Sequence, residues 1–249
     1  MPEPGAVLFD LDETLLDDDA SMHRALRMVC SALGAGYGLP AEALARAYLG
    51  VAERTWPELG SVPTAGRPDL ADGWAIRVWM WREALGAVDA APDLAGEAAG
   101  RYRSARRRTY RAFDDVLPAL RCLAREYRLG VVTNGAPDTQ REKLEALGLG
   151  EYLGTVVISG EVGVGKPDPE IFRIALGELD APPHRAVHVG DSLESDVRGA
   201  ASAGIRAVWL NRAGRRPATG SARPAATIRT LAGLPALLAR LAEGASPPP

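Results

Sequence analysis

Two aspartates near the start of the chain are placed where they could act on one small molecule. Asp10 and Asp12 follow an apolar run at residues 6–9, with one residue between them. Carboxylates so spaced beyond a strand reach the same small volume, where one can bind a cation and attack phosphorus while the other handles the leaving-group proton. The competing interpretation is a solvated acidic turn, because three more aspartates follow at residues 17–19.

Two further segments contain groups that bind phosphate. Thr133, Asn134 and Gly135 end another apolar run, and a threonine hydroxyl with the N–H groups of a strand-to-helix turn can hold phosphate oxygens. Asn-Gly is also a common turn dipeptide, so an ordinary turn is the alternative. Lys166 lies between a glycine-containing loop and Pro167, where its point charge suits a phosphoryl group; the alternative is a surface lysine beside a helix start.

A fourth segment adds carboxylates at another strand end. Asp191 follows the apolar run at residues 186–189, and Asp196 lies five residues further on. Asp191 could complete a cation site with Asp10, because Mg²⁺ prefers oxygen ligands and keeps several waters. Alternatively, Asp191 or Ser192 caps the helix that follows. Together the four segments offer residue types that phosphoryl transfer can use.

The elements that position these segments alternate between strand and helix. Short apolar runs predict strands at residues 6–9, 129–133, 156–159, 186–189 and 207–210. Amphipathic stretches predict helices at residues 116–127, 139–147, 169–179 and 194–203. This alternation predicts an α/β fold with a doubly wound, Rossmann-like parallel sheet, whose ligands bind beyond the carboxyl ends of the strands.

One helical insertion interrupts the alternation. Residues 17–111 show helical periodicity without a convincing strand, with a Gly- and Pro-containing loop at 60–69, so we expect a small helical domain there. Residues 1–16 and 112–242 would form the catalytic core, which ends in a strand near 227–228 and a helix at 235–241. We expect residues 243–249 to be a frayed tail.

The composition is that of an ordinary globular protein. The 249 residues are 47% hydrophobic and 24% charged with a formal net charge of −3, which does not call for nucleic acid or a membrane surface as partner. Apolar runs are too short to span a bilayer and the first residues do not resemble a signal peptide, so we expect a cytoplasmic protein. Cys30 and Cys122 are expected to be buried free thiols. A monomer is the default expectation, with a weak dimer as the alternative.

In this order the four segments resemble the haloacid dehalogenase-like hydrolase superfamily. The residues that carry the resemblance are Asp10-x-Asp12-x-Thr14, Thr133-Asn134-Gly135, Lys166-Pro167 and Gly190-Asp191 with Asp196. The resemblance covers residues 5–16 and 112–235, and the helical insertion is similar to that superfamily's type-one cap. Residues 133–140 and 190–199 look closest to the branch of N-acylneuraminate-9-phosphatases and house-cleaning nucleotidases.

The resemblance implies that Asp10 is a nucleophile which becomes an aspartyl-phosphate. Asp12 would protonate the leaving oxygen and then activate water, and Lys166 would neutralise charge on the phosphoryl group. The residues that would bind this group are Thr133, Asn134 and Lys166. The residues that would hold Mg²⁺ are Asp10, Asp12 (through its backbone carbonyl) and Asp191. Thr14 would satisfy the turn behind Asp10, and Asp196 would support the metal ligands directly or through water.

The implied activity is the Mg²⁺-dependent hydrolysis of a small phosphate monoester. The substrate classes left open are sugar phosphates, acyl-sugar phosphates and nucleoside monophosphates. A phosphomutase uses the same nucleophile and is the alternative. A haloacid dehalogenase releases a halide that needs no proton, so Asp12 argues against it. A receiver-type signalling domain normally carries its phosphorylated aspartate on a later strand and has no helical insertion.

Substrate choice should lie in the helical insertion. Its tryptophans are Trp56, Trp74, Trp79 and Trp81, and its basic run contains Arg101, Arg103, Arg106, Arg107 and Arg108. Tryptophans at helical spacing are more often packing residues than substrate platforms. The arginines are expected to form a solvated helix face. His188, inside the strand before Asp191, is expected to be a core residue.

Overall fold

The structure, a computed structural model, describes residues 5–59, 62, 70 and 72–242. The tail expected at residues 243–249 and, except for residue 62, the loop expected at 60–69 lie outside the described residues. Contacts within the chain divide it into two compact units. The sheet unit contains Met1–Asp17, Ala112–Asn134 and Gly148–Pro249. The helical unit contains Asp18–Arg111 and Gly135–Leu147.

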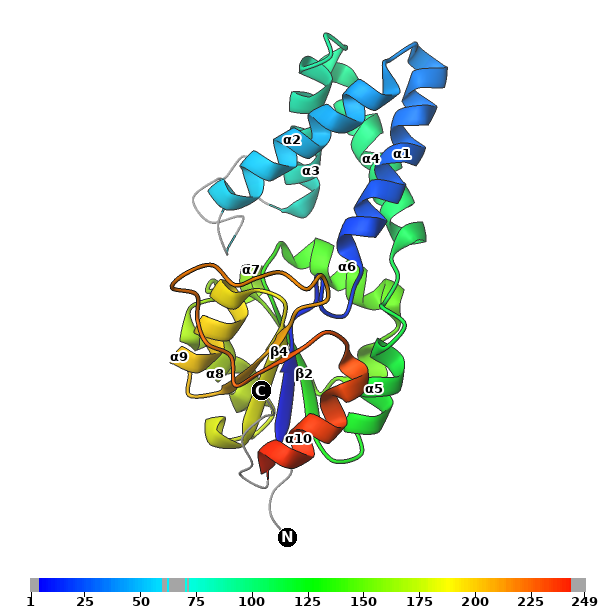
Figure 1. Cartoon of the computed structure of the whole chain (residues 1–249). Coiled ribbons are helices and arrows are strands. Elements are labelled where there is room, and N and C mark those ends of the chain that lie inside the picture. Colours follow the sequence, from blue (N-terminus) through cyan, green and yellow to red (C-terminus); the bar gives the residue numbers. More distant parts are fainter. Residues whose placement is uncertain (1–4, 60–61, 63–69, 71, 243–249) are drawn as a thin grey trace. The chain divides into compact units, whose positions relative to one another are not determined.

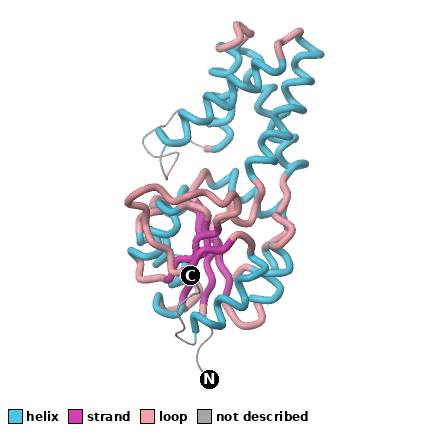
Figure 2. Tube along the Cα trace, viewed as in Figure 1, coloured by secondary structure: helices cyan, strands magenta, loops and turns pink. Residues whose placement is uncertain are grey.

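A single parallel sheet forms the centre of the sheet unit (Figure 2). Its strands are β1 (Ala6–Phe9), β2 (Arg128–Thr133), β3 (Thr155–Ile158), β4 (Ala186–Gly190), β5 (Arg206–Leu210) and β6 (Ala226–Ile228). They lie in the order β3-β2-β1-β4-β5-β6, and each neighbouring pair is parallel. Strands covered on both faces read as continuous apolar runs rather than as alternating patterns, which is why the sequence predicts them. The predicted doubly wound parallel sheet is confirmed.

Helices cover both faces of this sheet. In Figure 1, α5 (Val116–Leu123) and α10 (Leu234–Ala242) lie on one side, and α8 (Pro169–Glu178) and α9 (Gly199–Ser202) lie on the other. Phe172 of α8 packs with buried residues of the strands, including Leu8 and Val132. The helix expected at 194–203 is present as two consecutive pieces, the π-helical η5 (Leu193–Arg198) and the α-helical α9. The short element α7 (Ser159–Val162) follows β3.

The order of the strands determines where a ligand can bind. β1 lies between β2 and β4, so the chain winds in opposite directions on the two sides of β1. Such a switch point leaves a crevice beyond the carboxyl ends of the strands. Phe9, the last residue of β1, pairs with Val131 of β2 and with Val189 of β4. The residues that follow β1 and β4, together with the last residue of β2, therefore lie at one edge.

The helical unit contains no strand among its described residues, as expected. Its helices are α1 (Asp18–Tyr37), α2 (Ala41–Leu59), α3 (Gly73–Gly86), α4 (Ala95–Thr109) and α6 (Pro137–Leu147). Trp81 of α3 is fully buried, with its ring centroid 4.6 Å from that of Tyr48 and 5.8 Å from that of Tyr102. The packing role predicted for the tryptophans is thus confirmed for Trp81, whereas Trp56 and Trp74 are 48% and 38% exposed.

Ion pairs join α6 to the other helices of this unit. Nζ of Lys143 lies 3.2 Å from Oδ1 of Asp18, which also receives a 2.6 Å hydrogen bond from Arg106. Nε of Arg103 donates to Oε2 of Glu142 at 2.6 Å. The expectation of a solvated arginine face is therefore wrong for Arg106, which is 5% exposed. Although α6 follows β2 directly, it groups with the inserted helices rather than with the sheet.

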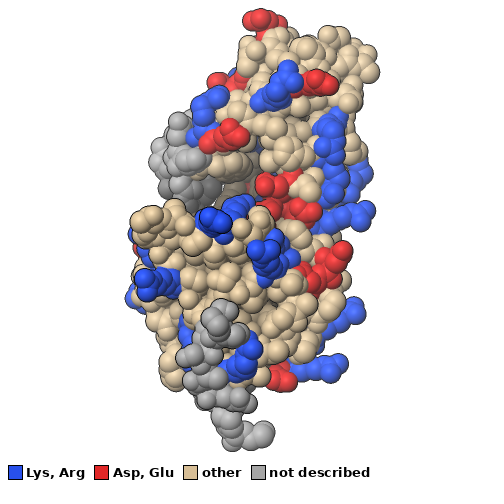
Figure 3. Space-filling model, in the orientation of Figure 1, with Lys and Arg blue, Asp and Glu red and all other residues tan. Residues whose placement is uncertain are grey.

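Several expectations concern surfaces and thiols. Charges of both signs are interspersed on the face shown in Figure 3, in keeping with the small net charge. Among the described residues, no helix is long and apolar enough to cross a membrane. Cys30 and Cys122 are both free. Cys30 is buried as expected, but Cys122 is exposed, because it lies on the outer side of the amphipathic helix α5.

Candidate active site

The site begins at Asp10, the residue that follows β1. Its backbone N–H donates to the carbonyl of Val189 at 2.9 Å, which extends the pairing of β1 and β4 by one residue. Its side chain is 6% exposed. A carboxylate is seldom buried to this degree without a cationic partner. The predicted Asp10 therefore lies at the carboxyl edge of the sheet, beside the switch point.

Lys166 is the cationic partner. Its Nζ lies 2.5 Å from Oδ1 of Asp10 and 2.7 Å from Oδ1 of Asp196, and its side chain is 3% exposed. Asp196 also contacts Nε2 of His188 at 2.9 Å and accepts a hydrogen bond from the N–H of Ser192 at 3.0 Å. The alternative reading of Lys166 as a surface lysine is wrong. Asp196, expected to play a supporting role, is bonded directly to the lysine.

Electrostatics show that this pocket holds too much negative charge for one lysine. Burial raises the pKa of Asp10 well above its ordinary value, and Asp196, Asp191 and Asp12 raise it further, although Lys166 lowers it. Burial, together with the charge of Asp196, raises the pKa of Asp191 to about 6. Burial lowers the pKa of Lys166, but the carboxylates of Asp10 and Asp196 outweigh burial and raise it. A further cation would relieve the excess of carboxylates.

Three carboxylates are close enough to share such a cation. Oxygens of Asp10, Asp191 and Asp196 lie within 4.8 Å of one another. The helix-capping role considered for this segment falls to Ser192, whose hydroxyl accepts a hydrogen bond from the N–H of Ser195 at 3.1 Å. Capping therefore does not require the carboxylate of Asp191. An all-oxygen donor set fits a hard cation such as Mg²⁺.

Asn134 holds the backbone of Lys166. Its side-chain nitrogen donates to the carbonyl of Lys166 at 2.9 Å, and its side-chain oxygen accepts from the N–H of Lys166 at 2.8 Å. The amide thus holds the lysine backbone in two directions. Thr133, the last residue of β2, is 1% exposed and lies at the same edge of the sheet. Binding of a phosphoryl group by Thr133 and Asn134 stays a prediction.

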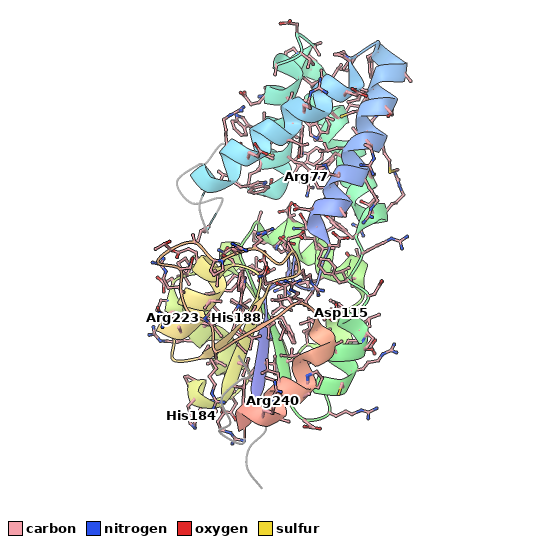
Figure 4. All side chains as sticks on the ribbon, in the orientation of Figure 1. Arg77, Asp115, His184, His188, Arg223 and Arg240 are labelled. Atoms are coloured by element: carbon pink, nitrogen blue, oxygen red, sulfur yellow. The ribbon has the colours of Figure 1, made fainter. Side chains whose placement is uncertain are left out.

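Two residues of the site were not predicted as functional. A Cβ atom at Gly190 would lie 2.2 Å from Cγ of Asp196, so glycine leaves the space that this carboxylate occupies. His188, labelled in Figure 4, was expected only in the core; it is fully buried, as predicted, but it also contacts Asp196. Burial lowers the pKa of His188, although Asp196 opposes this shift. One indication of a role for His188 was present in the sequence, since it is a polar residue inside an otherwise apolar strand.

The turn that carries Asp12 is tight. Leu16 forms a bridge with Asp12, and Glu13 has a φ of 59°, a conformation that costs a residue other than glycine roughly 1 kcal/mol. Thr14 is fully buried, but its hydroxyl has no hydrogen-bond partner among the described residues. Its backbone carbonyl accepts a hydrogen bond from Arg212, and the structural role of Thr14 behind Asp10 stays a prediction.

Known proteins are similar to this sequence over most of its length. Residues 4–204 match a family model described as haloacid dehalogenase-like hydrolase. A phosphoserine phosphatase of Thermus thermophilus is 39% identical over 234 residues, which cover 88% of this chain and 92% of that protein. The N-acylneuraminate-9-phosphatase of Mus musculus is 35% identical over 237 residues, which cover 94% of this chain and 93% of that protein.

A solved structure has the same fold and a similar sequence over most of the chain. A 2-haloacid dehalogenase from Pseudomonas syringae matches with a TM-score of 0.67 and 30% identity, covering 96% of this chain and 99% of that one. The related phosphatases cover the chain almost end to end, and the residues of the four motifs meet at one edge of the sheet. The chain thus belongs to the haloacid dehalogenase-like hydrolases and is a phosphoric monoester hydrolase.

Proposed function

We propose that this protein hydrolyses a small phosphate monoester in a Mg²⁺-dependent reaction through an aspartyl-phosphate on Asp10. The observation that carries the proposal is the buried contact of Lys166 with Asp10, next to the carboxylates of Asp191 and Asp196. A buried carboxylate that faces a lysine and lies beside a cation site is suited to attack phosphorus, because the surrounding positive charge stabilises the transferring group.

The residues present fit Mg²⁺. The metal ligands we propose are Asp10, the backbone carbonyl of Asp12 and Asp191. Asp196 is bonded to Lys166, His188 and the N–H of Ser192, so we assign it to holding the lysine rather than to direct metal binding. When bound, Mg²⁺ would stabilise negative charge on the phosphoryl oxygens.

The side chains divide the reaction into two displacements. Asp10 forms a bond to phosphorus as the substrate oxygen leaves, and Asp12 donates a proton to that oxygen. Asp12, now ionised, takes a proton from water, whose oxygen attacks phosphorus and releases inorganic phosphate from Asp10. Thr133 and Lys166 hold the phosphoryl group throughout, by hydrogen bonding and by charge.

Two rivals use the same nucleophile. The fold is shared with a 2-haloacid dehalogenase, but a halide leaves without a proton, so that chemistry has no use for the carboxylate of Asp12. A phosphomutase is not distinguished by the sheet unit, since both reactions pass through a phosphorylated Asp10. The two phosphatase relatives favour hydrolysis.

We propose that the helical unit is a cap that selects the substrate. Two relatives are named for phosphatase activity on phosphoserine and on an N-acylneuraminate 9-phosphate, which are alkyl phosphates that carry a carboxylate. Another is named for glyceraldehyde 3-phosphate, an alkyl phosphate without a carboxylate. The substrates we propose are therefore small alkyl phosphates, and the test panel holds carboxylate-bearing ones together with sugar phosphates and nucleoside monophosphates.

The test is phosphate release from a panel of phosphate monoesters in Mg²⁺ and in EDTA. The panel holds phosphoserine, acyl-neuraminate 9-phosphates, sugar phosphates, nucleoside monophosphates and p-nitrophenyl phosphate. We expect release that needs Mg²⁺ and is strongest for one alkyl phosphate. Asp10→Asn should abolish turnover while leaving the unfolding temperature within a few degrees of wild type; Mg²⁺-dependent turnover by this variant would refute the mechanism. Transfer of phosphate between positions of a sugar, without release, would instead identify a mutase.

A further inference from the structure

Arg212 is a partly buried arginine near the proposed site that the reaction described above does not use. It lies two residues after β5, and its guanidinium makes two hydrogen bonds of 2.9 Å with the carboxylate of Asp115. Its Cζ lies 3.9 Å from the ring centroid of Phe113. The side chains of Arg212 and Asp115 are 18% and 16% exposed. A two-pronged, largely buried pair of this kind is held far more firmly than an ordinary surface ion pair.

The same guanidinium holds the turn that contains Asp12. Nη2 of Arg212 donates to the backbone carbonyl of Thr14 at 2.9 Å. Within this turn the N–H of Glu13 donates to Leu16 at 2.8 Å, and Glu13 has its positive φ. A strained conformation persists only where its surroundings enforce it. Arg212 is the side chain that fixes the Thr14 carbonyl, two residues beyond Asp12.

Asp115, labelled in Figure 4, binds Arg212 instead of capping its own helix. It occupies the N-cap position of α5, where aspartate usually accepts a hydrogen bond from its own helix, yet its side chain makes no capping bond. Instead its carboxylate binds Arg212 and accepts a hydrogen bond from the N–H of Leu231 at 2.8 Å. Burial raises the pKa of Asp115, but Arg212 and Leu231 outweigh burial and lower it.

The two chain segments braced by this pair also contact each other. Leu16 forms an antiparallel bridge with Ala112, and the N–H of Phe113 donates to the carbonyl of Leu15 at 3.2 Å. These segments, residues 14–16 and 112–115, lie in the sheet unit close to the points where the inserted residues 18–111 leave and rejoin it. Arg212 therefore bonds both to the turn behind Asp12 and to Asp115 at the start of α5.

We propose that Arg212 is a positioning residue that keeps Asp12 aligned to protonate the leaving oxygen. The proposal rests on the proposed function, because it acts through the acid–base role of Asp12. The proposal predicts that the loss of activity caused by replacing Arg212 depends on the leaving group of the substrate. An alkoxide needs a proton to leave, whereas p-nitrophenolate is stable as an anion. Loss of alignment should therefore impair the hydrolysis of alkyl phosphates and largely spare p-nitrophenyl phosphate.

The test measures kcat and KM for both kinds of substrate in Arg212→Met, with the best alkyl phosphate of the panel. We expect kcat/KM, which reports the displacement that expels the leaving group and not the later attack of water, to fall about 10- to 100-fold for the alkyl phosphate and less than about threefold for p-nitrophenyl phosphate. Arg206→Met is the matched control: Arg206 donates to the Leu241 carbonyl at 2.7 Å, but it is the first residue of β5 and so lies at the amino end of the strand. This control should change both substrates alike.

Two further variants separate failure of this proposal from failure of the proposed function. Asp12→Asn should show the same leaving-group selectivity as Arg212→Met, and the double variant should add no further selectivity. Equal losses of kcat/KM on both substrates in Asp12→Asn would refute the acid role of Asp12 itself, since kcat/KM does not include the later step in which Asp12 activates water. Selectivity in Asp12→Asn but equal losses, or no loss, in Arg212→Met would overturn only the role of Arg212. If Arg212→Met does not fold, Asp115→Asn, which removes half of the same pair, takes its place under the same criteria.

Discussion

Replacing Asp191 by asparagine should make the metal-free protein more stable at alkaline pH. Burial and the neighbouring charge of Asp196 raise the pKa of Asp191 from 3.8 to about 6. A difference of about two pKa units corresponds to about 3 kcal/mol, because each unit is worth about 1.4 kcal/mol. Well below pH 3.8 the carboxyl is neutral in both the folded and the unfolded protein. Well above pH 6 it is ionised in both, and the folded state is destabilised by the full amount of about 3 kcal/mol.

The free energy of unfolding in urea, followed by tryptophan fluorescence in EDTA, measures this effect. At pH 8, Asp191→Asn should exceed wild type by up to about 3 kcal/mol, or roughly 6–12 °C in unfolding temperature, and the difference should shrink below pH 6 and vanish below about pH 3. Added Mg²⁺ should stabilise the wild type and not the variant. The control variant Asp114→Asn, which replaces an exposed aspartate, should change neither the stability in EDTA nor the stabilisation by Mg²⁺. A variant that is less stable than wild type in EDTA at pH 8 would refute the reasoning.

Two other substitutions follow from the same contacts. Lys166→Met should lower the free energy of unfolding by about 3–5 kcal/mol at pH 8 in urea, because Asp10 and Asp196 would remain buried without their cation; a loss below 1 kcal/mol would contradict the ion pairs. Gly190→Ala should reduce kcat at least about tenfold by displacing the Asp196 carboxylate, whereas Gly177→Ala, where a Cβ meets nothing within 4 Å, should keep full activity and gain about 0.5–1 kcal/mol of stability.

Local patterns in the sequence were sufficient to predict the sheet and the ends of its strands. β1 begins and ends where predicted, since an apolar run of four residues is closed by Asp10. Asp10 and Lys166 lie 156 residues apart in sequence, yet each follows its own local signal, and the parallel topology brings them together. The π-helical type of the segment after Ser192 was not predictable, because its six residues are too few for the spacing of apolar positions to distinguish i→i+5 from i→i+4 hydrogen bonding.

Contacts between distant polar residues have no such local signal. Arg106 and Asp18 are 88 residues apart, and Arg106 stands in a run of arginines that looks like a solvated face. The grouping of α6 with the helical unit depends on the same kind of contact, made by Lys143 and Glu142. Periodicity records which face of a helix is apolar, but it does not record which buried charge meets which partner.

Asn134 and Arg212 illustrate why the most sensitive positions of this site need not touch the substrate. The amide of Asn134 binds the backbone of Lys166 through both its nitrogen and its oxygen, and the guanidinium of Arg212 binds both Asp115 and the carbonyl of Thr14. Hydrogen bonds used in this way fix the positions of catalytic groups before substrate arrives, so no binding energy is spent on ordering them. Substitution at such residues should therefore lower kcat more than it raises KM, whereas substitution of a residue that only binds substrate should do the reverse.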